Sequence, residues 1–233
     1  MESSKHGHDH EHGVYSQHNH DHCHSHHHGD DVFAHRSKEY DTLEHECRAK
    51  TIAQQIVHNA PIPINKDTNM MDFGAGTGLL TQSLADHAGH ITAVDVSPAM
   101  LDIFRSKSFA CDPSTIQADL VENDALLNGA TFDCIVSSMA LHHVNNLPAL
   151  FERLAKWTVP NGFIALADLD KEDGSFHDNQ HMPGVFHHGH DRKELEELAT
   201  KSGFQDVVFH TVDVIKKDQG EYPIFLMTAM RSA

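Results

Sequence analysis

A glycine-rich turn between a short buried strand and a helix restricts the fold of this chain more than any other feature. The stretch reads MDFGAGTGLL, from Met71 to Leu80. Glycines at Gly74, Gly76 and Gly78 allow the backbone to turn sharply and to approach a ligand closely. The helix after the turn begins with unpaired N–H groups that a ligand can use. The spacing is G-x-G-x-G, which differs from the G-x-G-x-x-G of dinucleotide-binding loops and disfavours a dehydrogenase.

Strand-like and helix-like segments alternate around this turn. Strands are expected at residues 70–73, 90–96, 115–118, 132–137, 163–169, 206–215 and 222–230. Helices are expected at residues 49–58, 79–87, from 98, at 147–154 before a closing Pro160-Asn161-Gly162, and at 191–202. This order predicts an α/β, Rossmann-like fold, with a seven-stranded, mostly parallel sheet and helices on both faces. No helix separates the last two strands, which predicts a C-terminal antiparallel hairpin.

The first thirty residues differ in composition from the rest of the chain. Eleven histidines fall between His6 and His28, and large apolar residues are nearly absent. We therefore expect a disordered His-rich tail at residues 1–30 and one domain at residues 31–233. Imidazole suits zinc and nickel, so the tail is expected to bind such ions loosely. The histidines in its densest part are His18, His20, His22, His24, His26, His27 and His28. A metal-handling role, incidental metal binding and an expression artefact all remain open.

Charge and composition exclude several classes of partner and compartment. The formal net charge is −17, which repels phosphate backbones and argues against nucleic acid as a partner. No run of about 18 apolar residues exists, so no membrane span is expected. The N-terminus lacks the apolar core of a secretory signal, and the four cysteines show no paired spacing. We expect a cytoplasmic or nuclear protein, and the sequence predicts no oligomeric state.

Four further motifs follow the glycine turn in order. Asp95 ends the second expected strand, 19 residues after Gly76, where an acid can accept hydrogen bonds from ribose hydroxyls. Asp119 follows the third strand. The strings DFGAGTG, VDVSPAML, QADL and FDCIVSSMALHHV together resemble the ordered motifs of class I S-adenosylmethionine-dependent methyltransferases, over roughly residues 33 to 230. The SSMALHHV string is similar to the small-molecule branch that includes ubiquinone-biosynthesis enzymes.

The resemblance implies a set of residues around S-adenosyl-L-methionine. Asp72 and the glycine loop would surround its methionine part, Asp95 its ribose, and Ser137 with Met139 would face the transferring methyl group. The complete implied set is Tyr40, Asp72, Gly74, Ala75, Gly76, Gly78, Asp95, Val96, Met100, Asp119, Leu120 and Ser137.

The methyl acceptor is only partly restricted by the sequence. The [DN]-PP-[YF] tetrapeptide of base and amide methylation is replaced by SSMA, and no Pro-Cys nucleophile is present. A small-molecule acceptor is favoured, while a protein acceptor stays open. A different class also stays open, namely a non-catalytic metal-binding or regulatory protein that retains the fold.

No residue is identified as catalytic by sequence alone, because a sulfonium is already an activated methyl donor and a general base is needed only for a protonated acceptor. Two groups of histidines lie where a base is expected, after the fourth strand and in the segment 170–190 after the fifth. A structural role for each is the alternative. The candidates are His142, His143, His177, His187 and His188. Phe176, Met182 and Phe186 are expected to form an apolar lid or to pack on the sheet.

Overall fold

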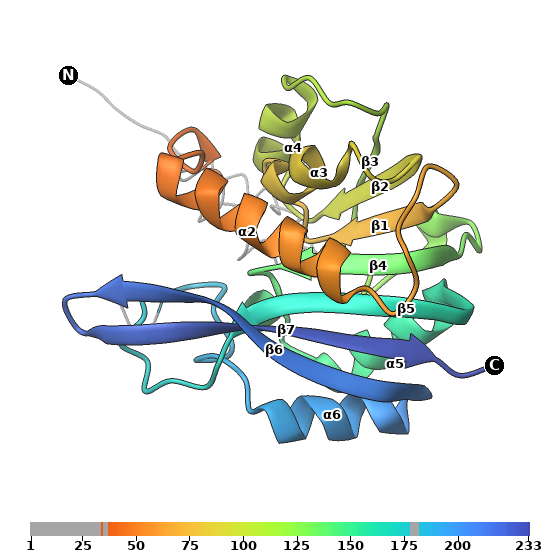
Figure 1. The fold of residues 1–233 in the computed structure, drawn as a ribbon. Helices are drawn as coiled ribbons and strands as arrows, with labels where there is room; N and C mark the ends of the chain where they lie inside the picture. The colour runs from red at the N-terminus through yellow and green to blue at the C-terminus, as the bar shows by residue number, and fades with distance from the viewer. Residues whose placement is uncertain (1–33, 35–36, 178–181) are drawn as a thin grey trace, which may run out of the picture.

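Seven strands form a single sheet in the order β3-β2-β1-β4-β5-β7-β6 (Figure 1). The structure is a computed structural model, and it describes residue 34 and residues 37–177 and 182–233. The strands are β1 (Asn69–Phe73), β2 (His90–Asp95), β3 (Ser114–Gln117), β4 (Phe132–Ser138), β5 (Thr158–Leu169), β6 (Phe204–Lys217) and β7 (Gly220–Arg231). Strands β1 to β5 pair in parallel, whereas β7 runs antiparallel to both β5 and β6. The predicted Rossmann-like fold class with its C-terminal hairpin is confirmed.

Helices cover both faces of this sheet. They are α2 (Leu43–Asn59), α3 (Leu79–Leu84), α4 (Pro98–Arg105), α5 (Leu147–Trp157) and α6 (Arg192–Lys201), with short 3-10 turns η1 (Ala125–Leu127) and η2 (Leu141–His143). In Figure 1, α2 crosses in front of the sheet, and α6 lies below β6 and β7. Ser97 is the N-cap of helix α4, and Pro98 lies in its first turn. Proline is favoured there because the N–H that it lacks would have no partner within the helix.

Alternation along the strands divides the core into two layers. Met71 and Ile135 pack with α5 and α6 on one face, and Met70 and Cys134 pack with α2 and α3 on the other. Successive strand residues point to opposite faces, and a parallel sheet covered on both sides needs apolar residues at nearly every position. This explains why the central strands read as continuous apolar runs.

Several element boundaries differ from the sequence-based expectation. Helix α5 ends at Trp157, and β5 begins at the next residue, so the Pro160-Asn161-Gly162 run lies within a strand instead of a loop. Thr158 at that boundary pairs with Phe132 of β4, and a register irregularity separates this pair from the rest of the ladder. Residues 159–162 have no partner in the β4 ladder, and Asn161 has a positive φ of 62°, so the run keeps a turn-like bulge within the strand. Helix α2 begins at Leu43, before the expected start, because Thr42 caps it.

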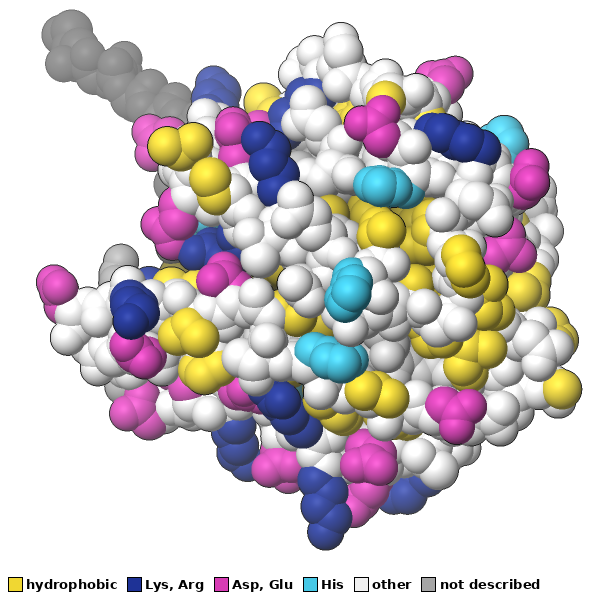
Figure 2. Space-filling view, viewed as in Figure 1, with side chains coloured by type: hydrophobic (Ala, Val, Ile, Leu, Met, Phe, Trp, Pro, Cys, Tyr) yellow, Lys and Arg dark blue, Asp and Glu magenta, His cyan; other side chains and the backbone are white. Residues whose placement is uncertain are grey.

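The parallel strands all end at one edge of the sheet, and the β6–β7 hairpin extends past that edge on the left of Figure 1. No helix among the described residues combines the length and apolarity required to cross a membrane. Acidic and basic side chains are interspersed on the face drawn in Figure 2, without a continuous basic surface there. The expectation that nucleic acid is not a partner stays a prediction.

Candidate active site

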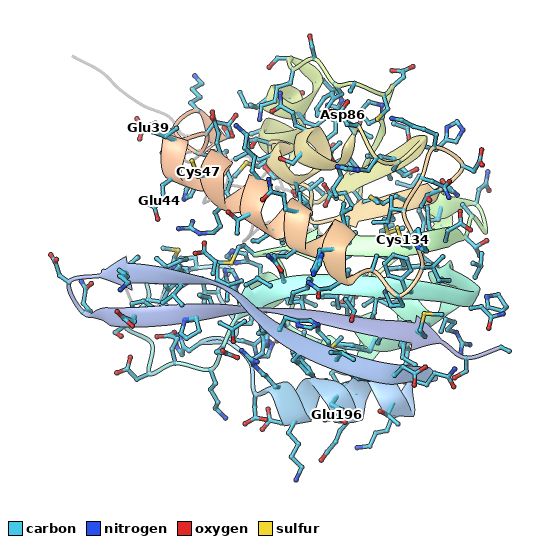
Figure 3. The ribbon with its side chains drawn as sticks, viewed as in Figure 1. Glu39, Glu44, Cys47, Asp86, Cys134 and Glu196 are labelled. Carbon is cyan, nitrogen blue, oxygen red and sulfur yellow. The ribbon has the colours of Figure 1, made fainter. Side chains whose placement is uncertain are left out.

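A cavity of about 1060 Å³ lies at the carboxyl ends of the parallel strands. One end is formed by the glycine turn and the residues that follow β2 and β3. The other end is formed by η2, the start of α2, the end of β6, and Phe176, His177, Met182, Gly184 and Phe186. Figure 3 shows Glu39 and Glu44, two residues of the cavity wall, at the start of α2. This position agrees with the general location of ligands in open α/β sheets.

The three glycines of the turn have different roles. All three have positive φ, at 70° for Gly74, 54° for Gly76 and 86° for Gly78. A Cβ at Gly76 would meet nothing within 4 Å, and this residue lines the cavity, so its bare backbone is open to a ligand. A Cβ at Gly78 would overlap the ring of Phe104 in α4. Gly78 does not line the cavity, and it serves helix packing instead of the cofactor contact that we expected.

Asp72 is a buried carboxyl at the floor of the cavity. Its Oδ2 accepts a hydrogen bond from Thr81 Oγ1 at 2.6 Å, and its Oδ1 has no hydrogen-bond partner among the described residues. Burial raises the pKa of this carboxyl to about 7, helped by the nearby Asp95. An unpaired buried carboxyl oxygen is costly unless a donor approaches it. The position therefore suits a cationic ligand group such as an ammonium.

Asp95 closes β2 and is oriented by the backbone around it. Its Oδ2 accepts the Gly76 N–H at 2.7 Å, and its Oδ1 accepts the Ser97 N–H at 2.8 Å. Burial raises the pKa of Asp95, although these backbone donors oppose the rise. Each carboxylate oxygen still has a free lone pair, because an ionised carboxylate accepts about four hydrogen bonds. Asp95 thus meets the requirement for binding a pair of ribose hydroxyls.

Beyond Asp95, the wall of the first end of the cavity is apolar, with one acidic residue at its edge. Val96, Met100 and Leu120 line it, as the resemblance implies for an adenine. Asp119 also lines the cavity, but its Oδ1 accepts the N–H groups of Val121 and Glu122. The Asp119 side chain therefore stabilises this turn, and through it the position of the backbone at the cavity wall.

The segment before α2 is attached to the glycine turn. Asp41 accepts a hydrogen bond from Thr77 Oγ1 at 2.5 Å and forms an ion pair with Lys107 at 2.6 Å. Tyr40 lines the cavity next to this attachment, and burial raises the pKa of its phenol. The backbone carbonyl of Tyr40 also accepts a hydrogen bond from His45 Nδ1 at 2.5 Å. Thus Tyr40 is held over the cavity, where the resemblance implies a covering helix.

Ser137 does not occupy the position that we expected. Its hydroxyl is fully buried and donates to the Phe73 carbonyl at 2.7 Å, and it does not line the cavity. Ser138 and Met139, the next two residues, line the cavity instead. The one-residue difference follows from strand alternation, which turns neighbouring side chains to opposite faces. Met139 also has a positive φ of 57°, where β4 turns into η2.

A loop from the segment after β5 is fastened to η2 at the second end of the cavity. Phe186 N–H donates to the His142 carbonyl at 2.9 Å, His143 Nδ1 donates to the Gly184 carbonyl at 2.6 Å, and His187 Nε2 donates to the Val144 carbonyl at 2.9 Å. Phe176, Met182 and Phe186 all line the cavity, as expected for the apolar lid. Phe186 is nevertheless half exposed, at 53%.

His142 and Asp168 form a buried hydrogen-bonded pair beside this loop. His142 Nδ1 donates to Asp168 Oδ1 at 2.8 Å, and the His142 backbone N–H reaches Asp168 Oδ2 at 3.3 Å. His142 is 3% exposed and lines the cavity, whereas Asp168 is fully buried behind it. Asp168 was not among the predicted site residues. The available signal was one acid inside the apolar strand FIALADL.

The five candidate histidines separate into two groups. His142, His143 and His177 line the cavity, with ring centroids 4.1 Å apart for His142 and His143 and 5.6 Å for His142 and His177. His187 and His188 do not line it, and His188 lies 3.6 Å from Glu172 in an ion-pair geometry. Burial, together with the neighbouring His142, lowers the pKa of His143 to about 4.

Other residues of the cavity wall belong to none of the sequence motifs. Arg48 of α2 lines the cavity and pairs with Glu44, and Lys217 at the end of β6 donates to the Phe176 carbonyl at 2.5 Å. These residues come from elements far apart in the sequence. Cys134 lies inside the sheet (Figure 3), where burial raises the pKa of its thiol to about 12.

The histidines of the tail lie outside the described residues. Within residues 37–177 and 182–233, no group of three or more His, Cys, Asp or Glu side chains is arranged to hold a metal ion. The expected metal binding by the tail therefore stays a prediction.

Comparisons with solved structures agree with this architecture. A chain from the complex of the Haloferax volcanii Trm112 methyltransferase activator with a methyltransferase is 17% identical, with a TM-score of 0.72 over 88% of this chain and 99% of that one. Magnesium protoporphyrin IX methyltransferase from Synechocystis, solved with bound S-adenosylhomocysteine, is 17% identical, with a TM-score of 0.59 over 81% of this chain and 84% of that one. At these identities the likeness establishes the fold.

Sequence comparisons identify the family. An uncharacterized methyltransferase from Schizosaccharomyces pombe is 35% identical over 134 residues, or 52% of this chain and 47% of that protein. A ubiquinone biosynthesis O-methyltransferase from Xanthomonas axonopodis is 29% identical over 111 residues, or 46% of this chain and 45% of that protein. The matches thus span about half the length of these relatives. A family model described as "Methyltransferase domain" matches residues 43–208. The predicted resemblance is confirmed, and the chain belongs to the methyltransferase-domain family.

Proposed function

We propose that this chain transfers the methyl group of S-adenosyl-L-methionine to a small-molecule acceptor. The observation that supports the proposal most directly is a single cavity with two chemically distinct ends. One end combines Asp72, Gly76 and Asp95, and the other combines buried histidines with apolar side chains. A donor and an acceptor can therefore meet within one cavity.

The residues of the first end fit S-adenosylmethionine. Asp72 would hold its ammonium group through the unpaired Oδ1, Asp95 would accept from its ribose hydroxyls, and Val96 with Met100 would contact its adenine. The bound donor supplies a methyl group on a positively charged sulfur that leaves readily. The main work of the protein is then to align the acceptor and to exclude water.

The second end favours a small molecule over a protein side chain. His142 is 3% exposed and Phe176 is 9% exposed, so both groups are reached only from inside the cavity. A protein acceptor would have to insert a side chain past the loop that is fastened to η2. The names of two similar proteins also refer to small molecules, ubiquinone biosynthesis and magnesium protoporphyrin IX.

Calorimetry with S-adenosylhomocysteine tests the donor site. We expect binding by the full chain, loss of binding in Asp95→Ala, and unchanged binding in the matched control Asp102→Ala on the exposed side of α4. Absence of binding to the folded protein, with zinc binding retained, would favour the non-catalytic metal-binding alternative.

The acceptor class is tested with methyl-labelled S-adenosylmethionine and a cell extract separated by size. We expect the label in the small-molecule fraction. Label recovered only in protein would contradict the small-molecule proposal, while the methyltransferase assignment would stand.

A further inference from the structure

We propose that His142 is the general base of the methyl transfer, that Asp168 positions it, and that the accepting group is therefore a hydroxyl. This inference rests on the proposed function, because it assigns a role in that reaction and names the acceptor chemistry. A sulfonium donor needs no base for an acceptor that already carries a free lone pair, such as a neutral amine. A base beside the methyl acceptor is useful when an O–H proton must be removed.

The contacts of His142 fix the direction of its ring. The Asp168 carboxylate accepts both the backbone N–H and the Nδ1–H of the same residue, at 3.3 and 2.8 Å. A carboxylate only accepts hydrogen bonds, so Nδ1 carries the proton in the neutral ring. Nε2 is then the basic nitrogen, and it is the nitrogen available to a molecule in the cavity that His142 lines.

The hydrogen-bond donors around Asp168 keep its carboxylate ionised. Its Oδ1 also accepts the Leu169 N–H at 2.7 Å, so three N–H groups in total point at this carboxylate. Burial opposes its charge, but His142 and these donors hold the pKa of Asp168 well below its usual range. A buried, ionised carboxylate behind an imidazole fixes its tautomer and stabilises the imidazolium that forms when Nε2 takes a proton.

The other titratable groups around the pair add little competing charge. Burial lowers the pKa of both His143 and His190 to about 4, and burial raises the pKa of the Tyr40 phenol, so all three are neutral near pH 7. Among the described residues, the titratable groups around the pair are Tyr40, His143, His177, His187 and His190. His142 is bonded to the Asp168 carboxylate through Nδ1.

The proposed step balances as a substitution at carbon. The acceptor O–H bond breaks and its proton passes to His142 Nε2, while an oxygen lone pair forms the new bond to the methyl carbon. The bond from that carbon to sulfur breaks with its electron pair, which leaves a neutral thioether. The imidazolium, stabilised by Asp168, later returns the proton to solvent.

The first test needs neither an acceptor nor activity. Nitrogen-15 NMR of the histidine rings reports which nitrogen of His142 carries the proton, with Asp168→Asn as the comparison. All carboxylate oxygens of Asp168 face N–H groups, so an amide at this position has to turn its NH₂ toward one of them. We expect the Nδ1–H tautomer in the natural protein and a smaller share of it in Asp168→Asn, because one of the two amide orientations directs the NH₂ at Nδ1. An Nε2–H tautomer in the natural protein overturns the proposal.

The second test separates catalysis from structure with two phenols of different acidity. With catechol as the probe, His142→Gln should lower kcat by about 10²- to 10⁴-fold, the usual contribution of general base catalysis. With 4-nitrocatechol, which is already ionised near neutral pH, the loss should be much smaller. S-adenosylhomocysteine affinity should not change. The control His188→Gln, outside the cavity, should leave both rates unchanged.

Equal losses with both phenols, or a lower unfolding temperature that accounts for the loss, would show a structural role for His142 and overturn the proposal. Methylation of 3,4-diaminobenzoate but of neither phenol would refute the hydroxyl assignment while the methyltransferase function stands. Failure to bind S-adenosylhomocysteine would refute the proposed function itself. If the cofactor binds but none of the three probes is methylated, the NMR measurement still decides the positioning role of Asp168.

Discussion

At the scale of single residues, burial and pairing decide which of several similar side chains takes part in the site. Asp72 and Asp168 are buried and Asp95 is half-buried, all three near strand ends, yet their surroundings differ. Asp168 receives three N–H donors, whereas Asp72 receives one hydroxyl and keeps an unpaired oxygen. The first environment stabilises a permanent charge, and the second leaves a carboxyl whose charge depends on a ligand.

This difference predicts a pH-dependent affinity for the methyl donor. The pKa of Asp72 is raised to about 7, so below that pH the carboxyl is protonated and lacks the charge that pairs with an ammonium. We expect the affinity for S-adenosylhomocysteine to fall as the pH decreases from 8 to 6, and to lose this dependence in Asp72→Asn. Calorimetry across this range measures it.

5′-Methylthioadenosine, which lacks the amino-acid part, is the matched ligand for this prediction. Its affinity should not follow the ionisation of Asp72. The same pH dependence for both ligands would contradict the role assigned to Asp72. The raised pKa of Asp72 also makes the stability of the folded protein depend on pH. An acid whose pKa is raised on folding favours the folded state at low pH, and this contribution is lost as the pH rises from about 4 to about 7.

At the scale of secondary-structure elements, the start of α2 is connected to the glycine turn through one acid. Asp41 accepts from Thr77 of the turn and pairs with Lys107 beyond α4, so three separate segments meet at its carboxylate. The same segment holds Tyr40 against the cavity. The position of this covering segment therefore depends on Asp41 as well as on helix packing.

Asp41→Ala should weaken S-adenosylhomocysteine binding by roughly tenfold, because a hydrogen bond to a charged group contributes about 1.5–3 kcal/mol. Calorimetry provides the measurement. The control is Asp102→Ala, whose carboxylate forms an exposed ion pair with Arg105 within α4. If both variants bind equally well, the covering segment is held by packing alone.

The buried face of α5 makes a second prediction at this scale. Leu154 is fully buried in the layer of the core that α5 and α6 share. Leu154→Ala should lower the free energy of unfolding by about 2–5 kcal/mol through lost burial and the cavity that it leaves. Urea unfolding measures it, with the exposed Glu152→Ala on the same helix as the control. A change below about 1 kcal/mol would show that the site collapses around the gap.

At the scale of the whole molecule, sheet topology brings the site together. The order β3-β2-β1-β4-β5-β7-β6 places the ends of β1, β2, β4 and β5 at one edge, where their acids and glycines meet. The hairpin of β6 and β7 then adds Ile215 and Lys217 to the cavity wall. Segments from both halves of the chain contribute to one site.

We predict that the His-rich tail is separable from this arrangement. The family match covers residues 43–208 and leaves residues 1–30 outside. We predict that a chain without residues 1–30 keeps its affinity for S-adenosylhomocysteine and loses most of its binding of nickel or zinc. Calorimetry with each ligand checks both parts. Lost cofactor affinity in the shortened chain would show that the tail belongs to the site.

The fold and the cofactor end of the cavity were largely predictable because their signals are local. A glycine turn between a strand and a helix is typical of a unit that binds a ligand. Alternating strand and helix segments predict a parallel sheet that helices cover on both faces. The positions of Asp72, Gly76 and Asp95 in the cavity follow from their place in these local units. Ser137 was misplaced by one residue because the exact end of a strand is not readable from its composition.

The acceptor end was decided only by the tertiary structure. The sequence predicted that histidines gather after the fourth and fifth strands, but it did not show which of them face the cavity. Asp168 contacts His142 across 26 positions, and Gly184 contacts His143 across 41. Such pairs depend on how two strand ends and one loop come together in space. The sequence by itself determined the family of folds and predicted the residues of a donor site, whereas long-range packing placed His142 in the cavity wall with a buried carboxylate behind it.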